Sequence, residues 1–303
     1  MTKTQSATRE RLSTIPELKS ASAPRPAPQG HWVGDGFPVR TIFAYDDSGV
    51  SPFLLMDHAG PAVFPASEKR RGVGEHPHRG FETVTIMYSG EVEHRDSGGA
   101  SGMIGPGDVQ WMTAGSGVVH EEMHSVEYSK RGGPFEAIQL WDNLPARHKM
   151  TKPNYQTLLA RDIPEVALGD DAGTARIIAG SLGDAHGPAK TFTPVNLWDV
   201  RLKGGKGALF ELPPGQMAAV FVLKGGVSVN GSTKIGAGEF VTFSRDGGAI
   251  RVDADVDSTV LVLGGEPIDE PVVGYGPFVM NTEAEIRRAI EDYRTGRMGH
   301  LSS

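Results

Sequence analysis

The stretch Gly105–Gly117, GPGDVQWMTAGSG, has a counterpart in Gly236–Gly248, GAGEFVTFSRDGG, with a Gly-x-Gly turn, an acidic residue and then a mostly apolar run. Upstream of each stretch, a strand-like segment ends in glycine and resumes with valine, as YSGEV at Tyr88–Val92 and as LKGGV at Leu223–Val227. Glycine permits the positive φ angles of a tight turn, and an acidic residue suits the point where the turn meets water. The matching order and spacing predict a duplicated β unit.

Short β-branched or alternating runs occur in both halves of the chain, for example TIFAY (41–45), ETVTIMY (82–88), AAVFVL (218–223) and TVLVLG (259–264). The 40 Gly and 21 Pro, with aromatic residues at only 7%, favour many turns. A chain of 303 residues is long enough for two domains. We therefore expect an all-β protein built from two tandem β-barrels.

Changes in composition along the chain suggest where the domains begin and end. The first 30 residues are rich in Ser, Ala, Pro and charge, which predicts a flexible tail, with a partner-binding arm as the alternative. Near the other end, Thr282 can cap a short helix over Glu283–Tyr293, which we expect to pack on a barrel. The expected organisation is a tail (1–30), a first barrel domain (31–145), a linker with peripheral strands (146–190) and a second barrel domain with the terminal helix (191–303).

Charge and cysteine content exclude several classes of function. The formal net charge of −7 and the pI of about 5.8 argue against direct binding to DNA or RNA, which needs clustered basic residues. Because the chain has no cysteine, a metal ion would depend on imidazole and carboxylate ligands. No apolar run suits a transmembrane helix or a signal peptide, so we expect a cytoplasmic protein without membrane association.

Two pairs of residues carry the candidate chemistry. His76 and His78 form the first pair, and His120 and Glu122 form the second. Side chains two residues apart on a β-strand point to the same face, so each pair can direct both side chains toward one ion. Three imidazoles and a carboxylate suit a divalent transition metal and leave a position open for water or substrate. We expect one such ion, held by these four residues, in the first barrel.

The second copy of the repeat favours a metal site over ordinary buried or surface histidines. The positions that match the three histidines are Glu211, Pro213 and, approximately, Arg251, so the duplicate keeps the scaffold without these histidines. The barrel itself therefore does not require histidine there. Glu82 is an alternative carboxylate ligand, because it lies four residues beyond His78 on the same strand parity; we prefer Glu122.

Five further polar residues of the first copy have two interpretations each. His58, His94 and His124 could line the pocket or orient a ligand, but a solvated loop position is the ordinary expectation for any one histidine. The same ambiguity applies to Arg79 and Glu93.

The sequence resembles the pirin family of the cupin superfamily over most of the chain from about residue 38 to 300. The resemblance rests on SPFLLMDHAGPA (51–62), HPHRGFETVT (76–85), AGSGVVHEEMH (114–124), QLWDNLP (139–145) and GPFVMNTEAEIRRAIEDYRTGRMG (276–299). It implies a bicupin fold of two jelly-roll barrels, with a metal in the amino-terminal barrel held by the four candidate ligands. Iron is the usual metal, so Fe(II) is expected, although Mn, Ni, Cu, Co and Zn suit the same ligands.

Two positions depart from the general cupin pattern, Arg70 in place of a glycine and Gly115 in place of a proline, and both look like the pirin variant. The amino-terminal extension is longer than the usual start of the family. Neither difference affects the four candidate ligands.

The resemblance implies an oxidoreductase similar to the pirins that act as quercetin 2,3-dioxygenases, which cleave flavonols with O₂. In that case Glu122 would also act as general base toward a flavonol hydroxyl. Phe53, Met56 and Trp111 are candidate apolar walls for this small aromatic substrate, with structural packing as the default alternative. A second interpretation is a non-enzymatic, redox-sensing regulator that binds a transcription factor or a metabolic enzyme. A third treats the metal as structural only.

Overall fold

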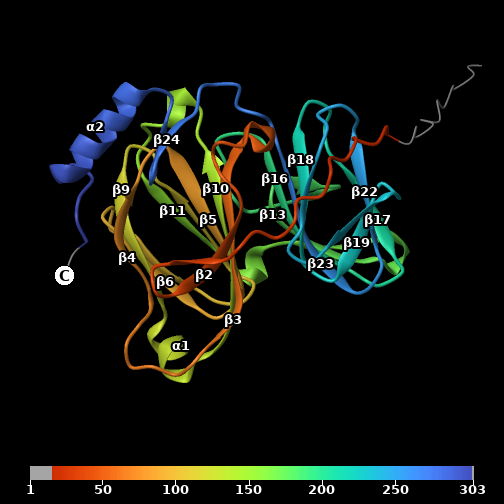
Figure 1. The fold of residues 1–303 in the computed structure, drawn as a ribbon, viewed down its shortest axis with the longest axis horizontal. Helices are drawn as coiled ribbons and strands as arrows, with labels where there is room; N and C mark the ends of the chain where they lie inside the picture. The colour runs from red at the N-terminus through yellow and green to blue at the C-terminus, as the bar shows by residue number, and fades with distance from the viewer. Residues whose placement is uncertain (1–15, 302–303) are drawn as a thin grey trace, which may run out of the picture.

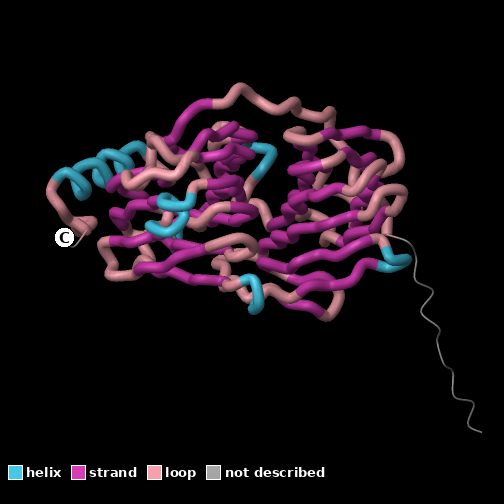
Figure 2. The backbone as a smooth tube through the Cα atoms, turned by 90° about the horizontal axis from the view of Figure 1, so that it is seen from below, coloured by secondary structure: helices cyan, strands magenta, loops and turns pink. Residues whose placement is uncertain are grey.

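The chain folds into two β halves of the same design, which lie side by side (Figure 1). The computed structural model describes residues 16–301. Strands run through both halves, and the longer of the two α-helices among residues 16–301 lies at one end of the molecule (Figure 2). None of the helices among residues 16–301 has the length and apolar character that a membrane-spanning helix requires.

The first half has a large sheet and a small sheet. In spatial order, the large sheet consists of β1 (His31–Val33), β2 (Phe37–Phe43), β3 (Phe53–Phe64), β10 (Gly133–Asn143), β5 (Phe81–Ser89), β8 (Val109–Thr113) and β11 (Asn154–Leu158). The small sheet consists, again in spatial order, of β4 (Gly72–His78), β9 (Val118–His124), β6 (Val92–Asp96) and β7 (Ser101–Ile104). A short helix, α1 (Val126–Arg131), connects β9 to β10.

The second half repeats this arrangement. Its large sheet consists of β12 (Glu165–Leu168), β13 (Gly173–Ala179), β16 (Val195–Leu202), β23 (Ser258–Gly265), β18 (Met217–Lys224) and β21 (Phe240–Phe243). Its small sheet consists of β17 (Gly207–Glu211), β22 (Ala249–Ala254), β19 (Gly226–Val229) and β20 (Thr233–Gly236). The remaining elements are the hairpins β14 (Ser181–Leu182) with β15 (Ala185–His186) and β24 (Val273–Tyr275) with β25 (Phe278–Met280), four short 3₁₀ turns (48–50, 146–148, 160–162 and 169–171), and the helix α2 (Glu283–Arg294).

The two halves match strand by strand, which confirms the predicted duplication. The order β3-β10-β5-β8 corresponds to β16-β23-β18-β21, and β4-β9-β6-β7 corresponds to β17-β22-β19-β20. The two glycine-bounded stretches fall on the equivalent strands β8 and β21. The mostly-β fold class with one short C-terminal helix is likewise as predicted.

Alternation along the large sheets places apolar side chains on both of their faces. In the second half, one face packs against the small sheet and forms an apolar core, with Phe210 and Val252 from the small sheet against Trp198 and Val220 from the large one. The other faces of the two large sheets pack against each other and share one buried cluster. The contact between the halves is therefore a true hydrophobic core.

Residues 16–29, predicted as part of a flexible tail, instead lie along the second half (Figure 1); residues 1–15 of that tail lie outside the described residues. The backbone N–H groups of Lys19, Ser22 and Arg25 donate to the carbonyls of Ala249, Thr242 and Phe240, all at 2.8 Å. The reason is that β21 is an edge strand, whose backbone groups on the side away from β18 would otherwise be unpaired. Composition alone does not reveal this distant pairing.

The predicted linker stretch 146–190 contributes strands to both halves. β11 covers the edge of the first large sheet beside β8, whereas β12 and β13 extend the second large sheet beside β16. The boundary between the halves therefore runs through this stretch, between β11 and β12.

The C-terminal segment returns from the second half to the first (Figure 1). The helix α2 begins at Glu283, as predicted, and Thr282 caps it by accepting the N–H of Glu285. Its buried face, Ile286 and Ala289, packs with Val119 of β9. Although the sequence places α2 next to the second barrel, it packs on the first.

Candidate metal centre

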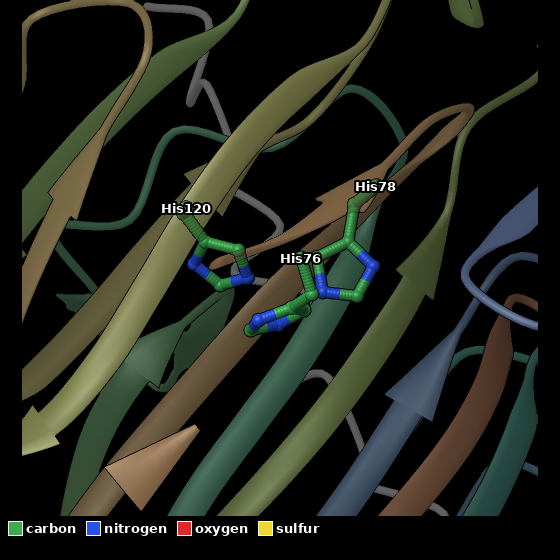
Figure 3. Close-up of side chains that lie close together, drawn as sticks. All are labelled: His76, His78 and His120. Atoms are coloured by element: carbon green, nitrogen blue, oxygen red, sulfur yellow. The ribbon is translucent and has the colours of Figure 1, made fainter. Parts of the chain in front are cut away.

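Two neighbouring strands of the small sheet bring three histidines together. His76 of β4 lies directly opposite His120 of β9, and His78 follows two residues later on the same face of β4. Their ring centroids are 4.2 Å apart for His76 and His120, 4.8 Å for His78 and His120, and 4.9 Å for His76 and His78. One nitrogen of each ring lies within 4.8 Å of those of the other two, and the rings face one another in Figure 3. This cluster is a candidate metal site.

The electrostatics of the cluster suit metal binding. Burial lowers the pKa values of His78 and His120 well below the usual histidine value, and the neighbouring histidines lower them further. Both rings are therefore neutral at pH 7, which is the form that binds metals. His120 Nε2 is buried and has no hydrogen-bond partner among the described residues. A buried nitrogen without a partner is costly unless something binds it, so these residues fit a metal ion.

Glu122 lies two residues beyond His120 on β9 and is also buried. Its carboxylate accepts hydrogen bonds on both oxygens: Oε1 from the amide of Gln110 and from the hydroxyl of Thr85 at 3.3 Å, and Oε2 from the amide of Gln139 at 3.1 Å. Among the described residues, the group within 4.8 Å comprises the three histidines without Glu122. Sequence reasoning found Glu122 but missed the three side chains that hold it.

Glu82 lies on the face of the large sheet that points away from Glu122. A turn at Gly80, where φ is +90°, separates β4 from β5, so strand parity does not continue from His78 to Glu82. On β5, Glu82 alternates with Val84, which faces the second half, whereas Thr85 reaches Glu122. Glu82 accepts a hydrogen bond from the Thr113 hydroxyl at 2.6 Å instead.

Two family models match the chain, one in each half. Residues 37–141 match the model Pirin, and residues 197–299 match the model Pirin C-terminal cupin domain. The chain belongs to the pirin family. Each half is thus a cupin domain, as the sequence predicted.

Several pirin relatives are similar over most of their length. A Pseudomonas aeruginosa protein named "Putative quercetin 2,3-dioxygenase" is 56% identical over 269 residues, 88% of this chain and 94% of that protein. "Pirin-like protein 2" from Arabidopsis thaliana is 40% identical over 278 residues, 88% of this chain and 81% of that protein. A crystal structure named quercetin 2,3-dioxygenase from Acinetobacter baumannii is 48% identical, with a TM-score of 0.91, and the match covers 94% of this chain and all of that one.

The other histidines of the first pirin domain are buried, so the solvated-loop expectation was wrong for all three. His58 Nε2 bonds Glu136 at 2.9 Å, and His124 Nε2 bonds the Gly36 carbonyl at 3.0 Å. His94 contacts His120 directly, with 3.3 Å between their Nδ1 atoms. The alternation Val92-x-His94-x-Asp96, all buried in β6, is the signal that could have placed His94 inside the domain.

Arg79 and Glu93 have structural partners in this pirin. The buried Arg79 guanidinium donates to the Ser116 carbonyl at 2.7 Å and pairs with Asp292 of α2 at 2.8 Å. Glu93 pairs with Arg70 at 2.6 Å, with both side chains partly exposed. Arg79 thus ties the histidine strand to the terminal helix.

Phe53, Met56 and Trp111, the candidate pocket walls, are buried in the cluster shared by the two large sheets. They pack against the second half, so packing, the default alternative, is the role their contacts support. A small cavity of about 50 Å³ adjoins Glu122 instead, on the inner face of the domain, where the large and small sheets of the first half face each other. Its apolar lining is Val33, Phe37, Val39, Ala59, Val73 and Ala137.

Proposed function

We propose that this pirin is a metal-dependent dioxygenase that cleaves flavonols such as quercetin with O₂. The observation that carries the proposal is the convergence of three imidazoles, together with the buried His120 Nε2 that lacks a partner among the described residues. The names of the relatives that are 56% and 48% identical support the choice of reaction.

The proposed ligands are His76, His78, His120 and Glu122, which would hold one divalent transition metal ion, with Fe(II) as the expected ion. Mn, Ni, Cu, Co and Zn suit the same ligand types. When bound, such an ion supplies Lewis acidity at a substrate oxygen. The buried, neutral imidazoles favour binding, because protons do not compete for their nitrogens.

The proposed role of Glu122 in the reaction is to accept the proton of a flavonol hydroxyl. Gln110, Gln139 and Thr85 hold its carboxylate on the inner face of the domain. A positioned base of this kind contributes about 10²–10⁴-fold to a rate.

Substrate would approach the cluster from the side of His76. His76 is partly exposed, whereas His78 and His120 are buried. The cavity beside Glu122 holds only a few water molecules at about 50 Å³, so a three-ring flavonol would keep most of its surface outside it. The apolar lining of that cavity would keep bulk water from the carboxylate.

The test is turnover of the Fe(II)-loaded protein. We expect it to consume O₂ and to bleach the flavonol absorbance of quercetin. His76→Ala should lose nearly all bound metal by elemental analysis, and Glu122→Gln should lower kcat by about 100-fold or more. The matched control is Glu82→Gln, a buried carboxyl on the opposite face, which should keep both metal and turnover. Absence of turnover with each of the six metals would overturn the proposal.

A further inference from the structure

A chain of contacts extends from His120 away from the metal cluster. His120 Nδ1 lies 3.3 Å from His94 Nδ1, and His94 Nε2 lies 2.9 Å from Asp96 Oδ2. The other oxygen of Asp96 accepts the backbone N–H groups of Gly98 at 2.8 Å and of Ala100 at 3.0 Å. His94 and His120 are almost wholly buried, so water does not offer alternative partners.

These contacts determine which nitrogen of each ring carries the proton. Burial by itself would raise the pKa of Asp96, but the hydrogen bonds from His94, Ala100 and Gly98 lower it overall, so Asp96 is an acceptor at neutral pH. His94 then donates its proton from Nε2 to Asp96, and its Nδ1, which lies 3.3 Å from His120 Nδ1, is the acceptor. His120 donates its Nδ1–H to that acceptor. The lone pair of His120 Nε2 is therefore left free on the side of His76 and His78.

Tyr155, from β11 of the first large sheet, contacts both His94 and Gln110, the residue whose amide holds the Glu122 carboxylate. Its ring stacks on His94 with centroids 4.5 Å apart and planes 16° apart. Its hydroxyl donates to Gln110 Oε1 at 3.1 Å, and the amide of Gln110 donates to Glu122. Gly102 makes room for the ring, because a Cβ there would lie 2.5 Å from the Tyr155 hydroxyl oxygen.

We infer that His94, Asp96 and Tyr155 are positioning residues of the metal site. His94 and Asp96 fix the Nδ1–H tautomer of His120, and Tyr155 holds His94 and Gln110 so that His120 Nε2 and the Glu122 carboxylate keep their orientation. The inference rests on the proposed metal-dependent function and names residues that support its ligands. Hydrogen bonds of this kind to a ligating histidine raise its basicity and fix its ring.

The second half provides an internal comparison. The strand β19 is equivalent to β6, and its buried residues are Val227 and Val229, where β6 has Val92 and His94. Its partner strands carry an apolar core in place of the histidine cluster. The supporting histidine is thus absent from the half that has no ligands, as expected if it serves the site rather than the fold.

The first experiment measures the tautomer in metal-free wild-type protein with ¹⁵N-labelled histidine, using His120→Ala to assign the signal. We expect long-range ¹H–¹⁵N correlations that place the proton of His120 on Nδ1. A proton on Nε2 would overturn the inference. Since no metal is present, this result does not depend on the proposed function.

The second experiment measures Co(II) affinity by competition with a chelator, and the Co(II) absorption bands. His94→Phe keeps a ring against Tyr155 but removes the acceptor, and should weaken binding by about 10–100-fold. His94→Asn places an amide oxygen near the Nδ1 position and should recover much of the affinity. Unchanged affinity and bands in His94→Phe, with a wild-type melting temperature, would contradict the inference. Failure of wild-type protein to bind any metal would instead contradict the proposed function.

Tyr155 is tested by a pair of substitutions. Tyr155→Phe keeps the stacking on His94 and removes only the hydroxyl, so Co(II) affinity should change less than in Tyr155→Leu, which loses both contacts. The kcat of Tyr155→Phe should fall by a larger factor than its Co(II) affinity, because the hydroxyl supports Glu122 through Gln110. Equal affinities in the two variants would overturn the role assigned to the ring.

Discussion

At the scale of the residue, two buried carboxyls of the first domain have opposite surroundings. Glu122 receives three hydrogen bonds on the inner face of the domain. Glu82 faces the second half, where burial raises its pKa to about 7 against the hydrogen bond from Thr113. Its cross-strand partner Asp142 is also buried, and burial raises its pKa as well. Strand alternation therefore places Glu122, whose carboxylate accepts several hydrogen bonds, on one face of the domain and the pair Glu82 and Asp142, which burial keeps from ionising readily, on the other.

Glu82→Gln should change how stability depends on pH. The carboxyl is ionised above about pH 4.5 in the unfolded chain but keeps its proton up to about pH 7 in the folded one. At Glu82 the folded state binds more protons in this window, so the contribution of this carboxyl to stability should fall as pH rises from 4.5 to 7 and level off above. Glutamine does not titrate, so the stability of the variant relative to wild type should rise by about 3 kcal/mol across that window.

The measurement is urea unfolding of both proteins at several pH values between 4.5 and 8. Glu127→Gln is the matched control, because Glu127 is an exposed residue of α1, with 76% of its side-chain surface accessible. A stability difference between wild type and Glu82→Gln that stays constant across this range would contradict the assignment.

At the scale of the element, the terminal segment acts as a strap across the histidine strand. The backbone of Arg79 pairs with Phe278 in β25, and its side chain pairs with Asp292 in α2. The buried Lys149 ammonium donates to the carbonyls of Gly80 and Val279, at 2.8 and 3.1 Å. The residue after His78 is thus held by a segment two hundred positions away in the sequence.

Asp292→Ala should destabilise the protein by about 3 kcal/mol, because it leaves the buried Arg79 guanidinium without its carboxylate. It should also weaken metal binding, since His78 adjoins Arg79. Thermal unfolding and Co(II) competition measure the two effects. Glu283→Ala is the control: it removes an exposed pair with Arg287 on the same helix and should cost less than about 1 kcal/mol. Equal losses of stability and of Co(II) affinity in the two variants would contradict the role of the terminal segment in holding the histidine strand.

At the scale of the whole molecule, local sequence patterns predicted most of the fold and the histidine cluster. Pairings between segments far apart in the sequence were not predicted. The repeated glycine turns, the strand runs and the Thr282 cap are local, and they predicted the duplicated fold and α2. The His76, His78 and His120 cluster also follows from spacing within strands. The pairing of residues 18–25 with β21 and the start of β22 depends on contacts more than two hundred residues apart, which composition does not encode. Tyr155 was missed for the same reason, because its strand looked like a linker.

The packing of the halves also decides which face of the first large sheet meets substrate. Met56 is buried and packs in the cluster between the halves, whereas Val39 lines the small cavity beside Glu122 on the inner face. Met56→Ala should therefore cost about 2–5 kcal/mol of stability and leave quercetin KM and kcat at 25 °C unchanged. Val39→Ala should alter KM for substrates that reach the cavity. Urea unfolding and steady-state kinetics separate the two effects, and a change in KM for Met56→Ala at unchanged stability would restore Met56 as a pocket wall.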